Sequence, residues 1–209
     1  CYNVPSMKNF LYLILIVLFT TCEDAADTSA EATSFQQHIP DTTKNFLAAA
    51  HYRSHYVQTI LVQHQLQLEN IENGTSAPEV RMWVLTGSFD PQVLFQLRKT
   101  DSMVWKLRVV QYQALQNNCV QADYSVMLSD SVVNAFQLHQ YWSIPSQSEM
   151  QDGFQYGCMD GFVTLLEMAD ARKYKYATHT CPDIHAASDS NFYKINLLLD
   201  QFDRSSIQH

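Results

Sequence analysis

Glycine is scarce in this chain: it occurs five times in 209 residues. Loops that hold phosphate groups with backbone N–H groups need closely spaced glycines, and the sequence contains neither GxGxxG nor GxxxxGK[ST]. The GxSxG turn of serine hydrolases and the HExxH helix of metalloproteases are absent as well. Nucleotide-binding folds and these two hydrolase classes are therefore not expected.

Positive charge is also in short supply. The chain has 13 Lys and Arg residues against 21 Asp and Glu residues, which gives a formal net charge of −8. A protein that binds nucleic acid needs a basic face to neutralise phosphates, and attachment to anionic lipid by charge needs a basic patch. The charge balance argues against both.

No apolar segment gives a convincing membrane span. Phe10–Phe19 is a run of apolar residues and Tyr, but a helix of this length covers only about 15 Å, half of the hydrocarbon core. Lys8 before the run and small residues after it are typical of an export signal that begins at Met7. Cys22 follows directly, and "LFTTC" resembles the bacterial lipobox, in which the cysteine receives a diacylglyceryl group after cleavage.

This pattern predicts three parts: upstream residues and a lipoprotein-type signal peptide over residues 1–21, an acidic flexible tether over 22–40, and a single domain over 41–209. Lipidation of Cys22 would place the protein in the bacterial cell envelope, at the outer membrane, on its periplasmic or surface face. An ordinary cleaved secretory signal and an uncut anchor helix are the alternatives. Thr21 stands where lipoboxes usually have Gly, Ala or Ser.

Apart from Cys1, upstream of the signal, and Cys22, the cysteines are Cys119, Cys158 and Cys181, which are odd in number, and no CxxC pair occurs. At most one disulfide can form among them, and Cys158–Cys181 is the first pair to test. Buried free thiols are the favoured interpretation of these cysteines.

The second half of the chain indicates a β-sheet. Alternating apolar and polar residues predict strands over 79–87, 92–99 and 103–112, joined by short turns as in an antiparallel meander, and a hairpin over 159–180. A helix capped by Ser129 follows the meander and runs past His139, and a C-terminal helix capped by Ser188 or Ser190 buries a stripe. The stripe comprises Phe192, Ile195, Leu198, Leu199 and Phe202. The predicted fold class is α+β, an antiparallel sheet with helices packed on one face.

The segment over residues 41–72 is ambiguous between helix and strand, and its Ala and Gln content favours helix.

The β half also resembles a family of small, Bacteroidetes-like bacterial lipoproteins of unknown function, over roughly residues 79–203. The stretches that carry the resemblance are EVRMWV, YWSIPSQ, DGFVTLLEM and KYKYATHTCPD. The matching residues are Glu79, Arg81, Trp83, Phe89, Pro91, Arg98, Trp142, Pro145, Asp160, Gly161, Glu167, Tyr174, Tyr176 and Pro182. The resemblance implies export and the α+β architecture, and it brings no established activity.

Three groups of residues are candidates for chemistry. His51 and His55 would share a helix face, with a surface pair as the plainer interpretation. The second group, His179, Cys181, Asp183 and His185, contains metal-ligand types, but their alternate spacing before Pro182 favours a strand end and turn. The third is Glu167, which shares a strand face with apolar residues and is either a buried acid with a raised pKa or a partner of Arg172 or Lys173 across the hairpin.

Cys119 or Cys158 with a His partner remains possible as a nucleophile, although neither lies in a recognisable motif. Aromatic residues of the β half could form a ligand-binding face or pack in the core. They are Trp83, Trp105, Tyr112, Tyr124, Tyr174 and Tyr176.

No catalytic set assembles, so we expect a non-enzymatic binding or interaction module, without cofactor, metal or nucleic acid, held at the membrane by its lipid. The alternative is a hydrolase acting on cell-envelope material through Glu167 or a Cys/His pair. An exposed sheet edge that contacts another protein is a third interpretation.

Overall fold

The computed structural model describes residues 34–39, 59, 62–86, 92–113, 119–150 and 161–207. From Phe35 onward these residues belong to one compact unit. The signal-like segment and Cys22 lie outside the described residues, so lipidation and anchoring stay predictions. In the described part of the chain, no helix has the length and apolar character needed to cross a membrane.

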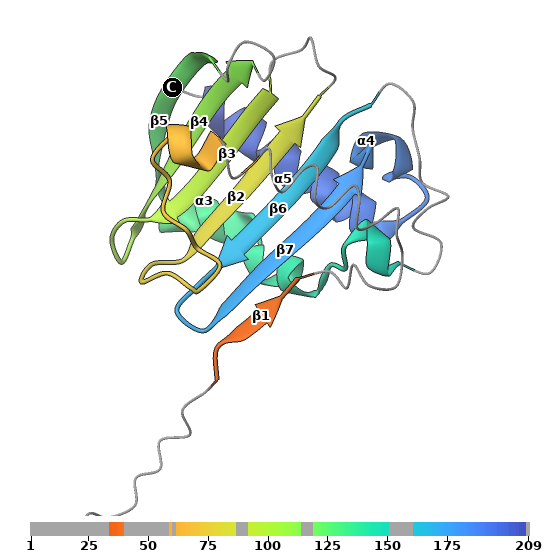
Figure 1. The fold of residues 1–209 in the computed structure, drawn as a ribbon, viewed down its shortest axis with the longest axis horizontal. Helices are drawn as coiled ribbons and strands as arrows, with labels where there is room; N and C mark the ends of the chain where they lie inside the picture. The colour runs from red at the N-terminus through yellow and green to blue at the C-terminus, as the bar shows by residue number, and fades with distance from the viewer. Residues whose placement is uncertain are drawn as a thin grey trace, which may run out of the picture. The chain divides into compact units, whose positions relative to one another are not determined.

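The described residues form a mixed α+β fold around a seven-stranded, mostly antiparallel sheet in the order β1-β7-β6-β2-β3-β4-β5 (Figure 1). The strands are β1 (Gln36–His38), β2 (Glu79–Leu85), β3 (Gln92–Lys99), β4 (Val104–Gln113), β5 (Cys119–Ser129), β6 (Val163–Ala169) and β7 (Lys173–Thr180). β2, β3 and β4 make the predicted antiparallel meander, which β5 extends, and β6–β7 make the predicted hairpin beside β2. The predicted fold class is therefore confirmed.

Two strands were not predicted. β5 pairs with β4 along its whole length, and its alternation of buried Val126 and Leu128 with exposed Ser125 and Met127 is an ordinary strand pattern. β1 lies in the segment predicted to be a tether and pairs in parallel with β7. Three residues with no buried side chain carry no strand signal, so β1 was not predictable.

The predicted helix after Ser129 is shorter than expected. Ser129 is the N-cap of α3 (Asp130–Ala135), although its side chain makes no capping hydrogen bond. The chain then turns through Gln137, which has a left-handed φ of 53°, into the 3₁₀ helix η1 (Leu138–Ser143). A second 3₁₀ turn, η2 (Gln147–Glu149), follows. The prediction of one helix through His139 is wrong because the backbone reverses at Gln137.

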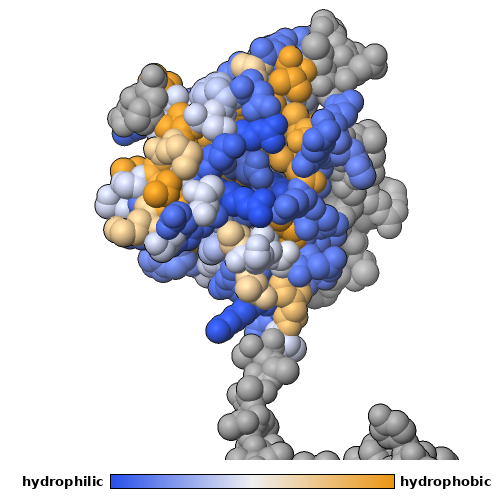
Figure 2. Space-filling model, turned by 90° about the vertical axis from the view of Figure 1, so that its left-hand side faces the viewer, coloured by the Kyte–Doolittle hydropathy of each residue, from blue (hydrophilic) through white to orange (hydrophobic). Residues whose placement is uncertain are grey.

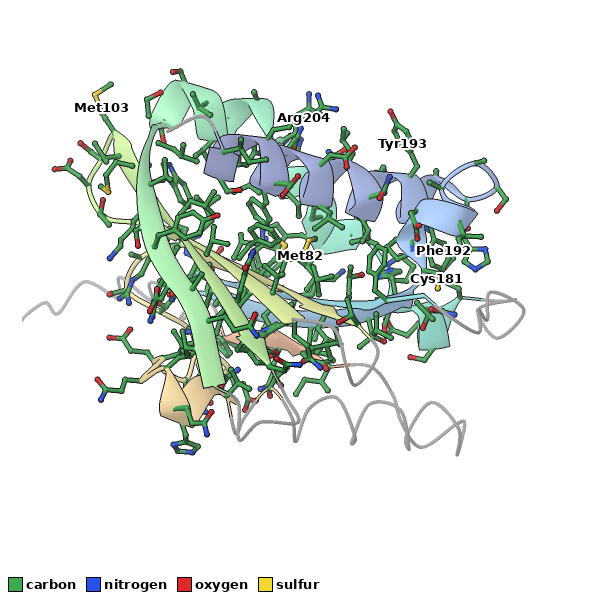
Figure 3. The ribbon with its side chains drawn as sticks, turned by 90° about the horizontal axis from the view of Figure 1, so that it is seen from above. Met82, Met103, Cys181, Phe192, Tyr193 and Arg204 are labelled. Atoms are coloured by element: carbon green, nitrogen blue, oxygen red, sulfur yellow. The ribbon has the colours of Figure 1, made fainter. Side chains whose placement is uncertain are left out.

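The last helix, α5 (Ser190–Ile207), follows the short helix α4 (Pro182–His185). Asp189, rather than Ser188 or Ser190, caps α5: its Oδ1 accepts hydrogen bonds from the backbone N–H groups of Asn191 at 2.6 Å and Phe192 at 3.4 Å. The predicted stripe is buried, with Leu199 partly so. Figure 3 shows α5 on one side of the sheet, with Met82 pointing into the layer between them.

The opposite face of the sheet is covered as well. A second apolar cluster joins Trp83 and Tyr112 of the sheet to Val62, Leu66 and Ile71. Residues 62–65 are helical, but residues 66–72 are not, so the prediction of helix through most of residues 41–72 fails for this last part. Core side chains therefore lie on both faces of the sheet. The predicted helices on one face cover only one of these two apolar clusters.

Candidate functional site

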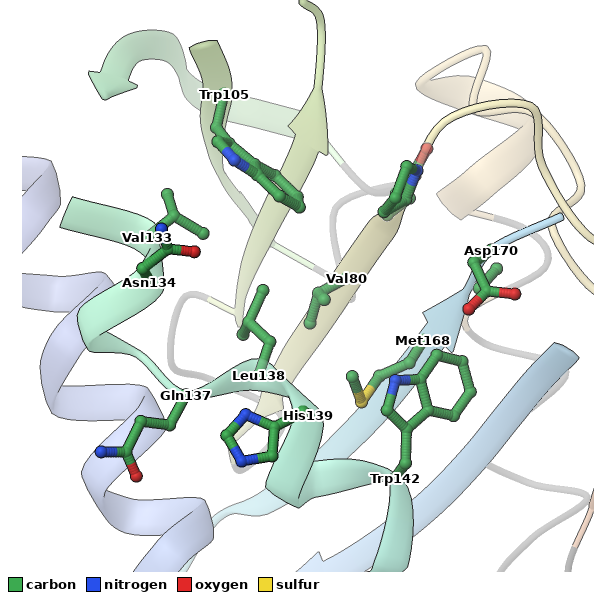
Figure 4. Close-up of a pocket in the computed structure, with 13 residues that line it drawn as sticks. Val80, Trp105, Val133, Asn134, Gln137, Leu138, His139, Trp142, Met168 and Asp170 are labelled. Atoms are coloured by element: carbon green, nitrogen blue, oxygen red, sulfur yellow. The ribbon is translucent and has the colours of Figure 1, made fainter. Parts of the chain in front are cut away.

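A cavity of about 250 Å³ lies between the sheet and α3–η1 (Figure 4). It sits where β2 and β4 begin and β6 ends. The lining residues are Pro78, Glu79, Val80, Trp105, Val133, Asn134, Gln137, Leu138, His139, Trp142, Met168, Ala169 and Asp170. Trp105 comes from the sheet and Trp142 from η1, so the cavity has an indole ring on both of the layers that enclose it.

The indole of Trp105 is held in place by polar partners. Its Nε1 donates to Asp130 Oδ1 at 2.8 Å, and Lys99 Nζ lies 3.3 Å from the same oxygen. Lys99 Nζ also lies 5.4 Å from the centroid of the Trp105 ring. The hydrogen bonds from Trp105 and Lys99 hold the pKa of Asp130 below its ordinary value. These contacts fix the ring before any ligand arrives.

Trp142 is fixed from β7. Lys173 Nζ lies 3.9 Å from the centroid of the Trp142 ring. Lys175 Nζ is buried and donates to the backbone carbonyl of Trp142 at 2.8 Å and to that of Ile144. Burial lowers the pKa of Lys175 to about 8. Two lysines of β7 therefore hold η1 against the sheet. Lys175 contacts backbone carbonyls at the end of η1, and Lys173 contacts the face of the Trp142 indole.

Polar groups line the rest of the cavity. Asn134, Gln137 and His139 come from α3 and the turn into η1. Asp170, at the β6–β7 turn, accepts hydrogen bonds from the backbone N–H groups of Arg172 and Lys173 at 2.8 and 3.0 Å. The cavity thus combines flat apolar rings with amide, imidazole and carboxylate groups.

Glu167 lies apart from this cavity, in a buried charge network that we define as Glu79, Arg81 and Glu167. Its carboxylate accepts hydrogen bonds from Trp83 Nε1 at 2.7 Å and from the Tyr174 hydroxyl at 3.1 Å, and the residue is 2 % exposed. Burial raises the pKa of Glu167, an effect partly offset by the charge of Arg81. Of the two interpretations of Glu167, the buried acid is correct.

Arg81 is the cation beside Glu167, since the two residues are paired across β2 and β6. Its Nε donates to Glu79 Oε1 at 2.6 Å, its Nη2 donates to the Glu69 carbonyl at 2.7 Å, and the side chain is fully buried. The predicted pairing of Glu167 with Arg172 or Lys173 is wrong, because the register places Tyr176 opposite Glu167.

The four residues proposed as metal-ligand types do not act together. His179 is fully buried, its Nε2 donates to the Pro145 carbonyl at 2.9 Å, and burial lowers its pKa to about 4. Cys181 is disulfide-bonded, so the free-thiol interpretation is wrong for this residue. Asp183 is exposed, and the His185 ring packs edge-on against Phe192. Within the described ranges, no group of three His, Cys, Asp or Glu residues is arranged to hold a metal ion.

Several predicted residues lie outside the described part of the chain: His51, His55, Cys158 and the side chain of Cys119. The predicted partner of Cys181, Cys158, is among them, and the Cys158–Cys181 pairing stays a prediction.

The aromatic residues divide between the two interpretations. Trp83, Tyr112, Tyr174 and Tyr176 are core residues, exposed by 1 % or less. Trp105 lines the cavity, and Tyr124 is exposed on β5. Trp142, which was not among the aromatic residues predicted to form a ligand-binding face, completes the cavity.

β5 is the edge strand of the described sheet at the end opposite β1. Its exposed apolar side chains are Val120, Tyr124 and Met127. Figure 2, which shows the side of the molecule where β5 lies, has mostly hydrophilic residues, with apolar residues in smaller groups among them. An edge strand of this length offers backbone groups to another chain, and contact through it stays a prediction.

Comparison with known proteins gives no relative: no family model, no curated protein and no solved structure matches this chain.

Proposed function

We propose that this chain is a lipid-anchored protein of the bacterial cell envelope whose domain binds a small ligand and catalyses no reaction. The signal-like segment, the acidic tether and Cys22 support the anchor at the outer membrane. The resemblance to small bacterial lipoproteins of unknown function supports the same location. The ligand-binding part of the proposal depends on the cavity alone.

The single observation that carries the binding function is the placement of Trp105 and Trp142 on the two layers that enclose one cavity. Both rings are held by hydrogen bonds or lysine contacts, which lowers the ordering cost of binding. Apolar rings with amide and carboxylate groups beside them suit a ligand that has one apolar face and a hydroxylated edge. We propose a saccharide unit of a cell-envelope glycan as the ligand.

The hydrolase alternative has less support. Glu167, its proposed acid, is buried and its carboxylate is occupied by Trp83 and Tyr174. It does not line the cavity described above. A general acid must reach the atom it protonates, which this position prevents.

Tryptophan fluorescence tests the binding function. Titration of the purified domain with soluble fragments of envelope glycans should shift the emission and saturate. Trp142→Ala should weaken binding at least tenfold, since truncation of an aromatic anchor in a cavity typically costs more than about 1.4 kcal/mol. Tyr193→Ala, at an exposed aromatic of α5, should leave affinity unchanged. Equal affinity of Trp142→Ala and the unaltered protein would contradict the proposal.

Fatty-acid labelling tests the anchor. Cells that express the full chain should incorporate labelled palmitate into it, and Cys22→Ser should abolish the label. Labelling that persists in the Cys22→Ser variant would show that the predicted lipobox is not used.

A further inference from the structure

The opposite face of the sheet carries a second cavity, of about 400 Å³, whose charge is opposite in sign to that of the whole chain. Its lining residues are Gln67, Leu68, Glu69, Gln96, Arg98, Thr100, Lys106 and Arg108. Three cationic side chains and one carboxylate line it, in a chain with 13 basic and 21 acidic residues. β4 contributes to both cavities, because Trp105 points to one face while Lys106 and Arg108 point to the other.

The strand register forces these cations together. Arg98 of β3 lies directly opposite Lys106 of β4, and Arg108 lies opposite Gln96. Like charges that face each other across a strand pair are destabilising. The register therefore keeps the cations Arg98 and Lys106 side by side, and an anion bound between them would reduce their repulsion.

The acidic partners of these three cations do not neutralise all of their positive charge. Arg108 is paired with Asp123 through two hydrogen bonds, of 2.9 and 2.6 Å. Arg98 Nε lies 3.7 Å from Oε2 of the buried Glu79, and its Nη1 pairs with Glu69 at 2.9 Å. The Glu69 side chain is 64 % exposed and can move away at little cost, which opens the Nη groups of Arg98 while Glu79 stays beside Nε. Among the described residues, Lys106 makes no hydrogen bond or ion pair and is exposed. Lys106 and Arg98 are thus the cations available to a ligand.

Neutral donors complete the lining. The amides of Gln67 and Gln96 line the same cavity. Gln96 Nε2 donates one N–H to Glu79 Oε1 at 2.7 Å and keeps a second, whereas the Thr100 hydroxyl already donates to the Val104 carbonyl at 3.2 Å. A planar guanidinium, an ammonium group and neutral N–H donors are groups that bind phosphate oxygens. With Glu69 and Asp123 counted against Arg98, Lys106 and Arg108, one positive charge is left over, which favours an anionic ligand.

We propose that this cavity binds the phosphate group of a small phosphorylated molecule or of a lipid headgroup, with Lys106 and Arg98 as the principal contacts. The site is separate from the Trp105–Trp142 cavity and does not depend on the saccharide proposal, because it lies on the other face of the sheet.

Titration of the protein with inorganic phosphate, followed by NMR of the amide and side-chain N–H groups, tests the site. Signals of Gln96, Arg98 and Lys106 should shift and saturate, while those of Trp142 stay in place. Lys106→Gln should weaken phosphate binding roughly tenfold, the effect of losing one charge-assisted hydrogen bond. Because Lys106 is exposed, this variant should fold, which thermal unfolding checks. Arg98→Gln is the second variant.

The matched control is Lys194→Gln, which removes the same charge from α5 on the other side of the sheet. Vesicles that contain phosphatidic acid form the other arm: binding to vesicles together with phosphate shifts indicates a headgroup, and phosphate shifts without vesicle binding indicate a soluble ligand. Absence of saturable shifts in both arms, or equal weakening by Lys194→Gln, would overturn the proposal.

Discussion

At the scale of single residues, the buried charge network is the most demanding feature of the molecule. Arg81 has no exposed surface, and it lies between two carboxylates, those of Glu79 and Glu167. A charge taken out of water is tolerated only when it is paired and hydrogen-bonded. Trp83, Tyr174 and Gln96 supply donors to the carboxylates, so the network uses most of its acceptors.

Arg81→Met should lower the free energy of unfolding by about 3–5 kcal/mol, because it leaves Glu79 without its buried cation. Chemical denaturation at neutral pH measures the loss. Arg204→Met, at an exposed position of α5, should change stability by less than about 0.5 kcal/mol. Similar small effects in both variants would mean that the network does not stabilise the fold.

The sequence indicated that Glu167 is unusual, because a carboxylate shared a strand face with apolar residues. It could not name the partner. The identity of the partner depends on β6 lying beside β2, a strand that comes more than eighty residues earlier in the chain. Local pairing across the hairpin would have given Glu167 a partner in Arg172 or Lys173. In the structure the neighbouring strand β2 supplies Arg81 instead.

At the scale of elements, the end of the helical turn over residues 62–65 shows how local chemistry stops a helix. The N–H of Leu68 donates to the Gln63 carbonyl at 2.9 Å, and that of Gln67 donates to the His64 carbonyl at 3.2 Å. Gln67 has a left-handed φ of 53°. This is the Schellman arrangement, in which glycine usually occupies the left-handed position.

Gln67→Gly should therefore stabilise the protein, by roughly 1 kcal/mol, since it removes the steric cost of a left-handed residue with a Cβ. Urea denaturation measures the gain. The same change at His64, inside the helical turn, should cost about 1 kcal/mol. Destabilisation by both substitutions would indicate that the Gln67 side chain has a role that outweighs its backbone strain.

Elements with strong alternation could be predicted, and those defined by a backbone reversal could not. β2, β3, β4, β6 and β7 follow their apolar patterns, and so does α5. The breaks at Gln67 and Gln137 carry glutamine, a good helix former, so nothing in the local sequence marks them. The cavity beside η1 depends on the second break, which explains why Trp142 was not recognised.

At the scale of the whole molecule, ionisation of buried bases links folding to pH. His179 is fully buried, and its pKa is lowered to about 4 from 6.5. Between these values the unfolded chain binds the proton more tightly than the folded one. Stability contributed by neutral His179 is therefore present above about pH 6.5 and is lost as the pH falls toward 4.

A second buried base, Lys175, acts in the same direction at higher pH. Its pKa is lowered to about 8 from 10.5, so stability rises with pH between these values. Glu167 acts in the opposite sense, because its raised pKa favours the protonated folded form and this contribution is lost as the pH rises. The pH dependence of stability in the unaltered protein is therefore the sum of contributions from several titrating groups. The contribution of one group is measured by replacing that group with a residue that does not titrate.

His179→Gln isolates the histidine, since a glutamine amide can still donate to the Pro145 carbonyl but does not titrate. Between pH 7 and pH 4 the unaltered protein should lose about 3 kcal/mol more unfolding free energy than the variant, from a shift of about 2.5 pH units at 1.36 kcal/mol each. Urea denaturation across this range measures the difference in slope, whatever constant offset the substitution brings. His64→Gln, at an exposed histidine, should keep the slope of the unaltered protein. Parallel curves for His179→Gln and the unaltered protein would show that His179 is not held neutral by its burial among β7, α5 and the Pro145 loop.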